Sequence, residues 1–135
     1  MSAVLIDSNI ILDLVTRDEV WSQWSAGMLR ALASEAILVI NPIVYAEVSA
    51  AFTKIEDVED TLPAELFRRE PLPYEAAFLA GRCHRAYRRR GGARPSILPD
   101  FYIGAHAAIR GHRLLTRDAR RFSGYFPTIE IICPQ

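Results

Sequence analysis

The chain is poor in cysteine and in long apolar stretches, and each scarcity excludes a class of protein. Its 2 cysteines, Cys83 and Cys133, lie far apart and belong to no CxxC pair or zinc-ligand spacing. A disulfide-rich secreted scaffold and a zinc module of the finger type are therefore excluded. We expect two reduced thiols in a cytoplasmic protein.

Charged residues interrupt every apolar run well before the roughly 20 residues that a membrane span needs, so no membrane association is expected. The N-terminus lacks the basic lead of a secretory signal, and Asp7 and Asp13 fall inside its apolar stretch. Half of the residues are hydrophobic and 24% are charged, as in globular proteins. We expect one domain over residues 1–135, with a substantial hydrophobic core.

The chain carries no net charge, yet its two parts are oppositely charged. Residues 1–81 hold 5 basic and 13 acidic side chains, whereas residues 82–135 hold 11 basic and 3 acidic side chains. The asymmetry is consistent with attraction between the two parts or with a basic surface for a polyanion.

Short apolar runs that predict buried strands alternate with patterns typical of helices. The expected strands cover residues 3–6, 36–40, 113–116 and 130–133. Helices are expected over residues 8–15, 20–32, 42 to about 52, 55–62, 74 to about 90, 100–111 and around 119–122. Three prolines between residues 63 and 73 predict a looser connection there. The alternation predicts an α/β fold, with a mainly parallel sheet flanked by helices on both faces.

Two acidic residues stand in apolar surroundings without a basic neighbour in sequence. Asp7 follows the first predicted strand, where a buried carboxylate needs a partner. Glu47 lies in the middle of a predicted helix, and the residues three and four positions away on either side are all apolar. Neither a helix cap nor a local ion pair explains these two carboxylates.

Two further acids are expected at the same edge of the sheet. Asp100 lies at a predicted helix start, and Asp118 follows the strand at residues 113–116. Each is also explained by simple helix capping. Because ligands in such folds collect beyond the carboxyl ends of the strands, all four acids are candidates for one site. Asp13 lies off the helical face of Asp7 and is interpreted as structural.

Four carboxylates in one place would repel one another unless a cation neutralised them. An all-oxygen ligand set favours a hard ion, Mg²⁺ or Mn²⁺, over zinc. The three histidines, His84, His106 and His112, lack the spacing of a metal cage and are interpreted as structural or surface residues.

Four segments in order along the chain resemble a PIN domain of the VapC toxin type: LIDSN, NPIVYAE, LPDFYIGAHA and LLTRDARRF. The resemblance spans essentially the whole chain. It implies a PIN-like three-layer fold and a metal-dependent endoribonuclease, the toxin of a type II toxin–antitoxin system. The family's catalytic and metal-binding acids fall on Asp7, Glu47, Asp100 and Asp118, and its polar accessory positions on Asn9 and Thr116.

The resemblance also implies cleavage that leaves a 5′-phosphate and a 3′-hydroxyl, a homodimer, and a cognate VapB-like antitoxin whose tail covers the active site. Transfer RNA is the expected substrate. Asp7 is the expected central ligand, Asp100 and Asp118 complete the metal shell, and Glu47 binds metal or orients the attacking water. Asn9 and Thr116 are expected to hold these carboxylates by hydrogen bonds.

Attraction for RNA must come from outside the acidic pocket. Residues 82–94 contain six arginines and no acid, and five more arginines lie between residues 110 and 121. Arginine suits bidentate contact with phosphate. We expect RNA contacts from Arg85, Arg89, Arg94 and Arg117, although a solvated helix end is the alternative.

Two other functional classes remain open. A phosphoryl-transfer or receiver-like protein also places an aspartate after a strand, but here Asn9 stands where a DxD motif needs its second aspartate. A non-catalytic RNA-binding or partner-binding module would account for the arginines and leave Asp7 and Glu47 unexplained.

Overall fold

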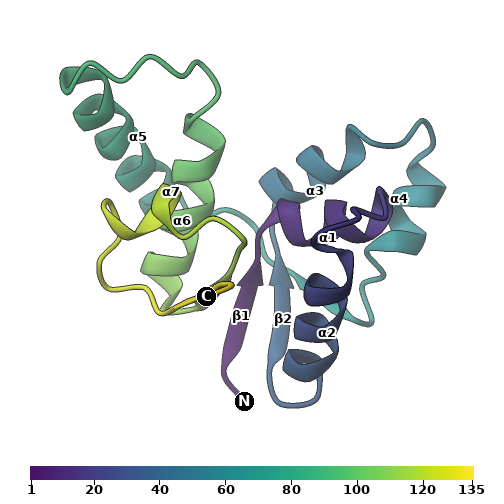
Figure 1. Cartoon of the computed structure of the whole chain (residues 1–135). Coiled ribbons are helices and arrows are strands. Elements are labelled where there is room, and N and C mark those ends of the chain that lie inside the picture. Colours follow the sequence, from purple (N-terminus) through teal and green to yellow (C-terminus); the bar gives the residue numbers. More distant parts are fainter.

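The computed structural model describes all 135 residues and contains five strands and seven helices (Figure 1). The strands are β1 (Ala3–Ile6), β2 (Ile37–Ile40), β3 (Phe67–Arg69), β4 (Arg113–Leu115) and β5 (Ile131–Ile132). The helices are α1 (Ser8–Val15), α2 (Ser22–Ala33), α3 (Pro42–Ser49), α4 (Ile55–Thr61), α5 (Tyr74–Arg89), α6 (Leu98–Arg110) and α7 (Arg120–Ser123).

The five strands form one parallel sheet in the order β3-β2-β1-β4-β5. Val4 in the central strand β1 pairs with Leu38 of β2 on one side and Arg113 of β4 on the other. Since all strands run in the same direction, the residues that follow β1, β2 and β4 meet at one edge. The predicted α/β class and parallel sheet are confirmed.

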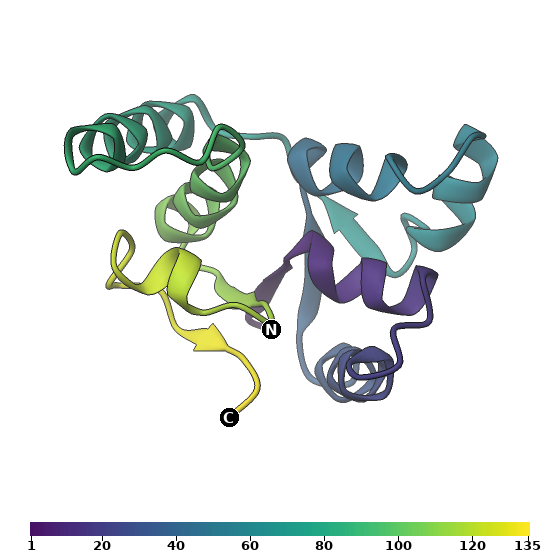
Figure 2. The same ribbon diagram turned by 45° about the horizontal axis from the view of Figure 1, so that its top comes forward.

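The helices form two groups on either side of the sheet. Helices α1 to α4 pack together on one side, and α5, α6 and α7 pack together on the other (Figures 1 and 2). Strand β1 is covered on both faces, so Val4, Leu5 and Ile6 are all fully buried. This double coverage explains why β1 is a continuous apolar run rather than an alternating one.

Several boundaries differ from the sequence prediction. Strand β3 was missed, because its stability comes from pairing with β2 and from burial of Phe67, not from an alternating pattern. Helix α6 starts at Leu98, before Asp100, and no side chain caps it. The prediction of Asp100 as the first helical residue was therefore wrong. None of the seven helices has the length and apolarity that crossing a bilayer requires.

Candidate active site

Asp7 lies at the junction of β1 and α1, with a side chain that is buried at the sheet edge. Its backbone N–H donates to the carbonyl oxygen of Leu115 at 2.9 Å, which extends the pairing of β1 with β4. The residue occupies the N-cap position of α1, but its carboxylate makes no cap bond to that helix. Instead, Thr116 Oγ1 donates to Asp7 Oδ2 at 2.7 Å. The carboxylate is thus turned away from its own helix and toward the carboxyl ends of the strands.

Glu47 reaches the same place from α3, the helix that follows β2. Ser8 Oγ donates to Glu47 Oε1 at 2.8 Å and lies 3.5 Å from Asp7 Oδ1. Ser8 therefore stands between the two carboxylates. Ser8 was not predicted at the site, although it directly follows Asp7.

Asp100 and Asp118 complete the group and share one arginine. Asp100 is buried on α6, whereas the side chain of Asp118, after β4, is 41% exposed. Arg121 Nη1 lies 3.6 Å from Asp100 Oδ1, and Arg121 Nε donates to Asp118 Oδ2 at 3.0 Å. Arg121 was not predicted at the site. We refer to Asp7, Glu47, Asp100 and Asp118 as the acidic site.

The electrostatics of the acidic site show that these carboxylates act on one another. Burial raises the pKa of Asp7 to about 6, and the negative charges of Asp100 and Glu47 add to this, against the Thr116 hydrogen bond and Arg121. Burial also raises the pKa of Asp100, with repulsion from Glu47 and Asp118 opposed by Arg121 and Arg94. The protein alone leaves negative charge in this place incompletely compensated. An all-carboxylate set of this kind suits Mg²⁺ or Mn²⁺.

The Thr116 hydroxyl takes part in three hydrogen bonds, which link Asp7 to Asn9 and to the backbone of Asp118. Besides donating to Asp7, its hydroxyl accepts from Asn9 Nδ2 at 3.4 Å and from the backbone N–H of Asp118 at 3.1 Å. Asn9 Oδ1 in turn accepts from the backbone N–H of Arg117 at 3.4 Å. Thr116 contacts Asp7 directly, whereas Asn9 acts on it through Thr116.

Asp13 lies outside the acidic site. It is buried and accepts from Ser25 Oγ at 2.7 Å and from Arg117 Nε at 2.8 Å. The Arg117 guanidinium also lies over the Trp21 ring, 5.5 Å from its centroid. Asp13 is therefore the ion-pair partner of Arg117, in keeping with its interpretation from sequence as a structural residue. Much of the Arg117 side chain is engaged by Asp13 and Trp21.

The other arginines predicted to bind RNA fall into two places. Arg85 and Arg89 line a shallow hollow on α5 of about 340 Å³, together with Arg82. Arg94 lines a different hollow of about 360 Å³, beside Tyr87 and Tyr125. Asp118 and Arg121 also line this second hollow, so it adjoins the acidic site at Asp118.

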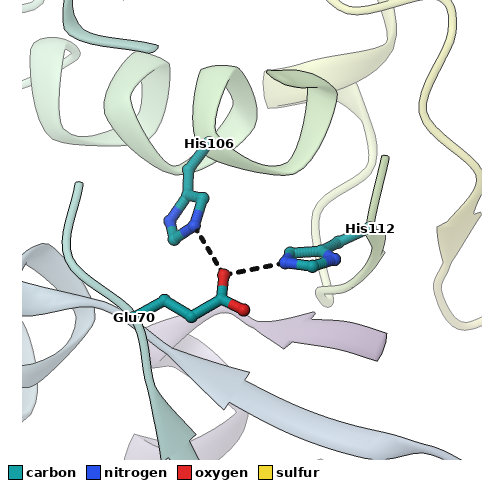
Figure 3. Close-up of side chains that lie close together, drawn as sticks. All are labelled: Glu70, His106 and His112. Atoms are coloured by element: carbon teal, nitrogen blue, oxygen red, sulfur yellow. Dashed lines mark hydrogen bonds and ion pairs between the residues drawn. The ribbon is translucent and has the colours of Figure 1, made fainter. Parts of the chain in front are cut away.

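A second group of possible metal ligands shares no residue with the acidic site (Figure 3). Glu70, which follows β3, meets His106 of α6 and His112, which precedes β4, and their ligand atoms lie within 4.8 Å of one another. His106 Nε2 and His112 Nε2 lie 3.0 and 2.8 Å from Glu70 Oε1. The spacing of the histidines in sequence did not predict this group, because only the fold brings the three residues together.

Comparison with known protein families identifies the fold. The model of the PIN domain family matches residues 4–125. The chain belongs to the PIN domain family. PIN domains are nucleases, and they generally use divalent metals. No curated protein matches the chain.

Solved structures show the same PIN fold over nearly the whole chain. VapBC2 from Rickettsia felis, bound to promoter DNA, has a chain with a TM-score of 0.73 and 18% identity, covering 98% of this chain and 99% of that one. VapBC-1 from Haemophilus influenzae has a chain with a TM-score of 0.71 and 17% identity, with 97% of both chains covered. A toxin–antitoxin complex from Klebsiella pneumoniae has a chain with a TM-score of 0.69 and 23% identity, with 98% of both chains covered. At these identities the structures establish the fold.

Proposed function

We propose that this PIN domain is a divalent-metal-dependent endoribonuclease that hydrolyses phosphodiester bonds in RNA. The observation that carries the proposal is the convergence of Asp7, Glu47 and Asp100 with Asp118 at one edge of the sheet. Two of these carboxylates, Asp7 and Asp100, have pKa values raised first by burial and then by the charges of the neighbouring acids. Mg²⁺ or Mn²⁺ is the proposed cofactor.

The four acids have different expected roles because their surroundings differ. Asp7, the most buried, is the central ligand, and Asp100 and Asp118 complete the metal shell. Glu47, oriented by Ser8, binds metal or orients the attacking water. An ion held by these residues would supply a water of lowered pKa and would stabilise charge on the leaving oxygen. Asn9 and Thr116 hold the carboxylates in position by hydrogen bonds, as residues that surround the ligands of a metal commonly do.

RNA would reach the acidic site along the basic side of α5 and the hollow at Arg94. Arg85 and Arg89 offer phosphate contacts remote from the carboxylates, and Arg94 offers one beside them. Tyr87 and Tyr125 line the same hollow as Arg94, and aromatic rings of this kind stack on unpaired bases. Arg117 contributes only those guanidinium N–H groups that Asp13 leaves free.

We further propose that the nuclease is the toxin of a type II toxin–antitoxin system and acts in the cytoplasm. The support is the sequence resemblance to VapC toxins and the likeness of fold to chains of VapBC complexes. A VapB-like antitoxin whose tail covers the acidic site, and a homodimer of this chain, are the expected partners. Transfer RNA is the proposed substrate.

Cleavage of RNA by the purified protein tests the nuclease proposal. We expect cleavage of transfer RNA with Mn²⁺ or Mg²⁺, none in EDTA, and none by Asp7→Asn. Asp57→Asn, which removes an exposed acid on α4, is the matched control and should cleave normally. Cleavage that persists in EDTA, or in Asp7→Asn at the full rate, would contradict the proposal. Ribosomal RNA cleaved in preference to transfer RNA would contradict only the substrate.

A further inference from the structure

A chain of four polar side chains, which we call the histidine network, joins α3 to α6. Asn41 precedes α3, and His106 lies in the second half of α6. Glu70, which directly follows β3, and His112, which directly precedes β4, continue this chain of hydrogen bonds (Figure 3). Asn41 and His106 are buried, so it matters for the fold which of the two donates the hydrogen bond between them.

The hydrogen bonds of Asn41 fix the protonation of His106. Asn41 Oδ1 caps α3 by accepting from the backbone N–H of Val44 at 2.9 Å. Its amide nitrogen, a donor only, therefore faces His106 Nδ1, also at 2.9 Å. The Nδ1 atom must be the unprotonated one, so the ring proton lies on Nε2 and is donated to Glu70 Oε1 at 3.0 Å. Burial lowers the pKa of His106, which also favours the neutral ring.

This arrangement opposes metal binding, even though the three ligand types are suitable. A metal on His106 Nε2 would displace the proton to Nδ1, where it would meet the Asn41 amide hydrogens. Histidine ligands normally donate their second N–H to an acceptor. Rotation of the Asn41 amide would provide one, but it would leave the Val44 N–H without its cap. The bonding therefore favours an internal hydrogen-bond network over a metal site.

We propose that the histidine network, without a metal, fixes α3 against α6 and thereby sets the position of Glu47 relative to Asp100. Helix α3 carries Glu47 and helix α6 carries Asp100, and the two helices are in contact. Ser8 ties Glu47 to the first residue of α1, but it does not reach α6. His106 and Asn41 are thus positioning residues for the acidic site. The catalytic consequence rests on the proposed nuclease function; the bonding pattern does not.

Nitrogen-15 NMR of the histidine rings tests the bonding without any activity assay. In the metal-free protein at pH 7 we expect neutral His106 with its proton on Nε2, unchanged by equimolar Zn²⁺. In Asn41→Asp the helix cap is kept, but the new carboxylate presents an acceptor to Nδ1, so a proton should appear there. A wild-type proton on Nδ1, a zinc-induced change at His106, or an unchanged tautomer in Asn41→Asp would each overturn the proposal.

Calorimetric titration of the acidic site with Mn²⁺ tests the positioning role. His106→Leu removes the hydrogen bonds of the ring to Asn41 and Glu70. It should weaken Mn²⁺ binding by roughly 10-fold, a typical cost of losing a residue that positions metal ligands. His106→Gln keeps a donor toward Glu70 and should recover part of the affinity. Leu32→Ala, a buried truncation on α2, is the control for lost stability alone and should bind Mn²⁺ normally.

Cleavage assays on the same variants separate this inference from the proposed function. For His106→Leu we expect a higher Mn²⁺ concentration at half-maximal rate, with a smaller loss of rate at saturating Mn²⁺. Unchanged Mn²⁺ affinity in His106→Leu, or an equal loss in Leu32→Ala, would overturn the positioning role. A wild-type protein that binds Mn²⁺ but leaves RNA intact would overturn the nuclease proposal, and the titrations would still decide the role of His106.

Discussion

At the scale of single residues, the acidic site combines a buried acid with partners that only partly compensate it. The side chain of Asp7 is 1% exposed and has one strong hydrogen bond, from Thr116. Arg121 adds a positive charge, but it is bound to Asp100 and Asp118 and not to Asp7. The free energy of the metal-free protein is therefore sensitive to the charge at this one carboxylate.

We predict that Asp7→Asn abolishes cleavage and stabilises the metal-free protein at pH 7.5. The pKa of Asp7 rises from 3.8 in the unfolded chain to about 6 in the folded protein. The folded state thus binds the proton more tightly, so stability falls as pH rises from about 4 to 6 and the cost is complete above 6. The difference corresponds to about 3 kcal/mol.

Thermal unfolding in EDTA measures this effect. At pH 7.5 the midpoint for Asp7→Asn should exceed that of the wild type by roughly 5–10 °C. At pH 4.5 the gap should shrink, because Asp7 is then mostly protonated in the folded wild type. A variant less stable than wild type at pH 7.5 would show that the carboxylate has a partner that the structure does not reveal.

Arg121→Gln is predicted to move metal binding and RNA binding in opposite directions. The guanidinium neutralises Asp100 and Asp118, and so competes with a cation for the same charges. Its removal should tighten Mn²⁺ binding about 3-fold to 10-fold, since an opposing charge is lost. It should weaken RNA binding, because Arg121 lines the hollow where a phosphate would lie. Calorimetry and KM measurements check the two effects, and weaker Mn²⁺ binding would contradict the first.

At the scale of elements, each predicted role depends on the face that a helix presents. Helix α5 is expected to hold RNA but not metal, since its arginines line a hollow separate from the carboxylates. Helix α6 is expected to hold metal but not RNA, since it carries the buried Asp100, which the buried His106 helps to position. Strand β4 and the segment after it place Thr116 and Asp118 at the sheet edge. The arginines of α5 and the acids of the site therefore lie on different elements, so the α5 arginines can be changed without changing the acids.

The double variant Arg85→Gln and Arg89→Gln should raise KM for RNA and leave Mn²⁺ affinity unchanged. Each lost phosphate contact should reduce the slope of log affinity against log salt by about 0.7 for single-stranded RNA. The control is the pair Arg30→Gln and Lys54→Gln, which removes the same charge from the other group of helices. If both double variants lose RNA affinity equally, overall charge and not the α5 surface attracts the RNA.

At the scale of the whole molecule, the acidic site lies where the two groups of helices meet across the sheet. Glu47 comes from the α1–α4 group and Asp100 from the α5–α7 group, while Asp7 follows the central strand (Figure 1). A cation held by all of them would connect both groups through β1. Its binding should therefore stabilise the entire fold and not one segment.

Saturating Mn²⁺ is expected to raise the unfolding temperature of the wild type. At about 100 times Kd the gain is about 2.7 kcal/mol, because the unfolded chain has no assembled site. The shift should be absent in Asp7→Asn and present in Asp57→Asn. Thermal scans over a range of Mn²⁺ concentrations measure it, and an equal shift in both variants would indicate binding elsewhere on the surface.

Much of the fold was predictable from local patterns. The buried strand before Asp7, the Asn41–Pro42 helix start and the glycine end of α5 near Gly91 depend on neighbours in sequence. Strand β3 was not predictable, because its three residues lack an alternating pattern and form a strand by pairing with β2. The proposed cap role of Asp100 failed for a related reason, since α6 begins earlier and Asp100 turns inward.

The sequence alone determined the α/β class, because apolar periodicity is visible along the chain. Its isolated carboxylates also led to the prediction that four acids share one site. Only the tertiary structure revealed Ser8 between Asp7 and Glu47, Arg121 between Asp100 and Asp118, and the histidine network. Most of these contacts join residues far apart in sequence. Their geometry depends on how the helices pack across the sheet, which no local pattern encodes.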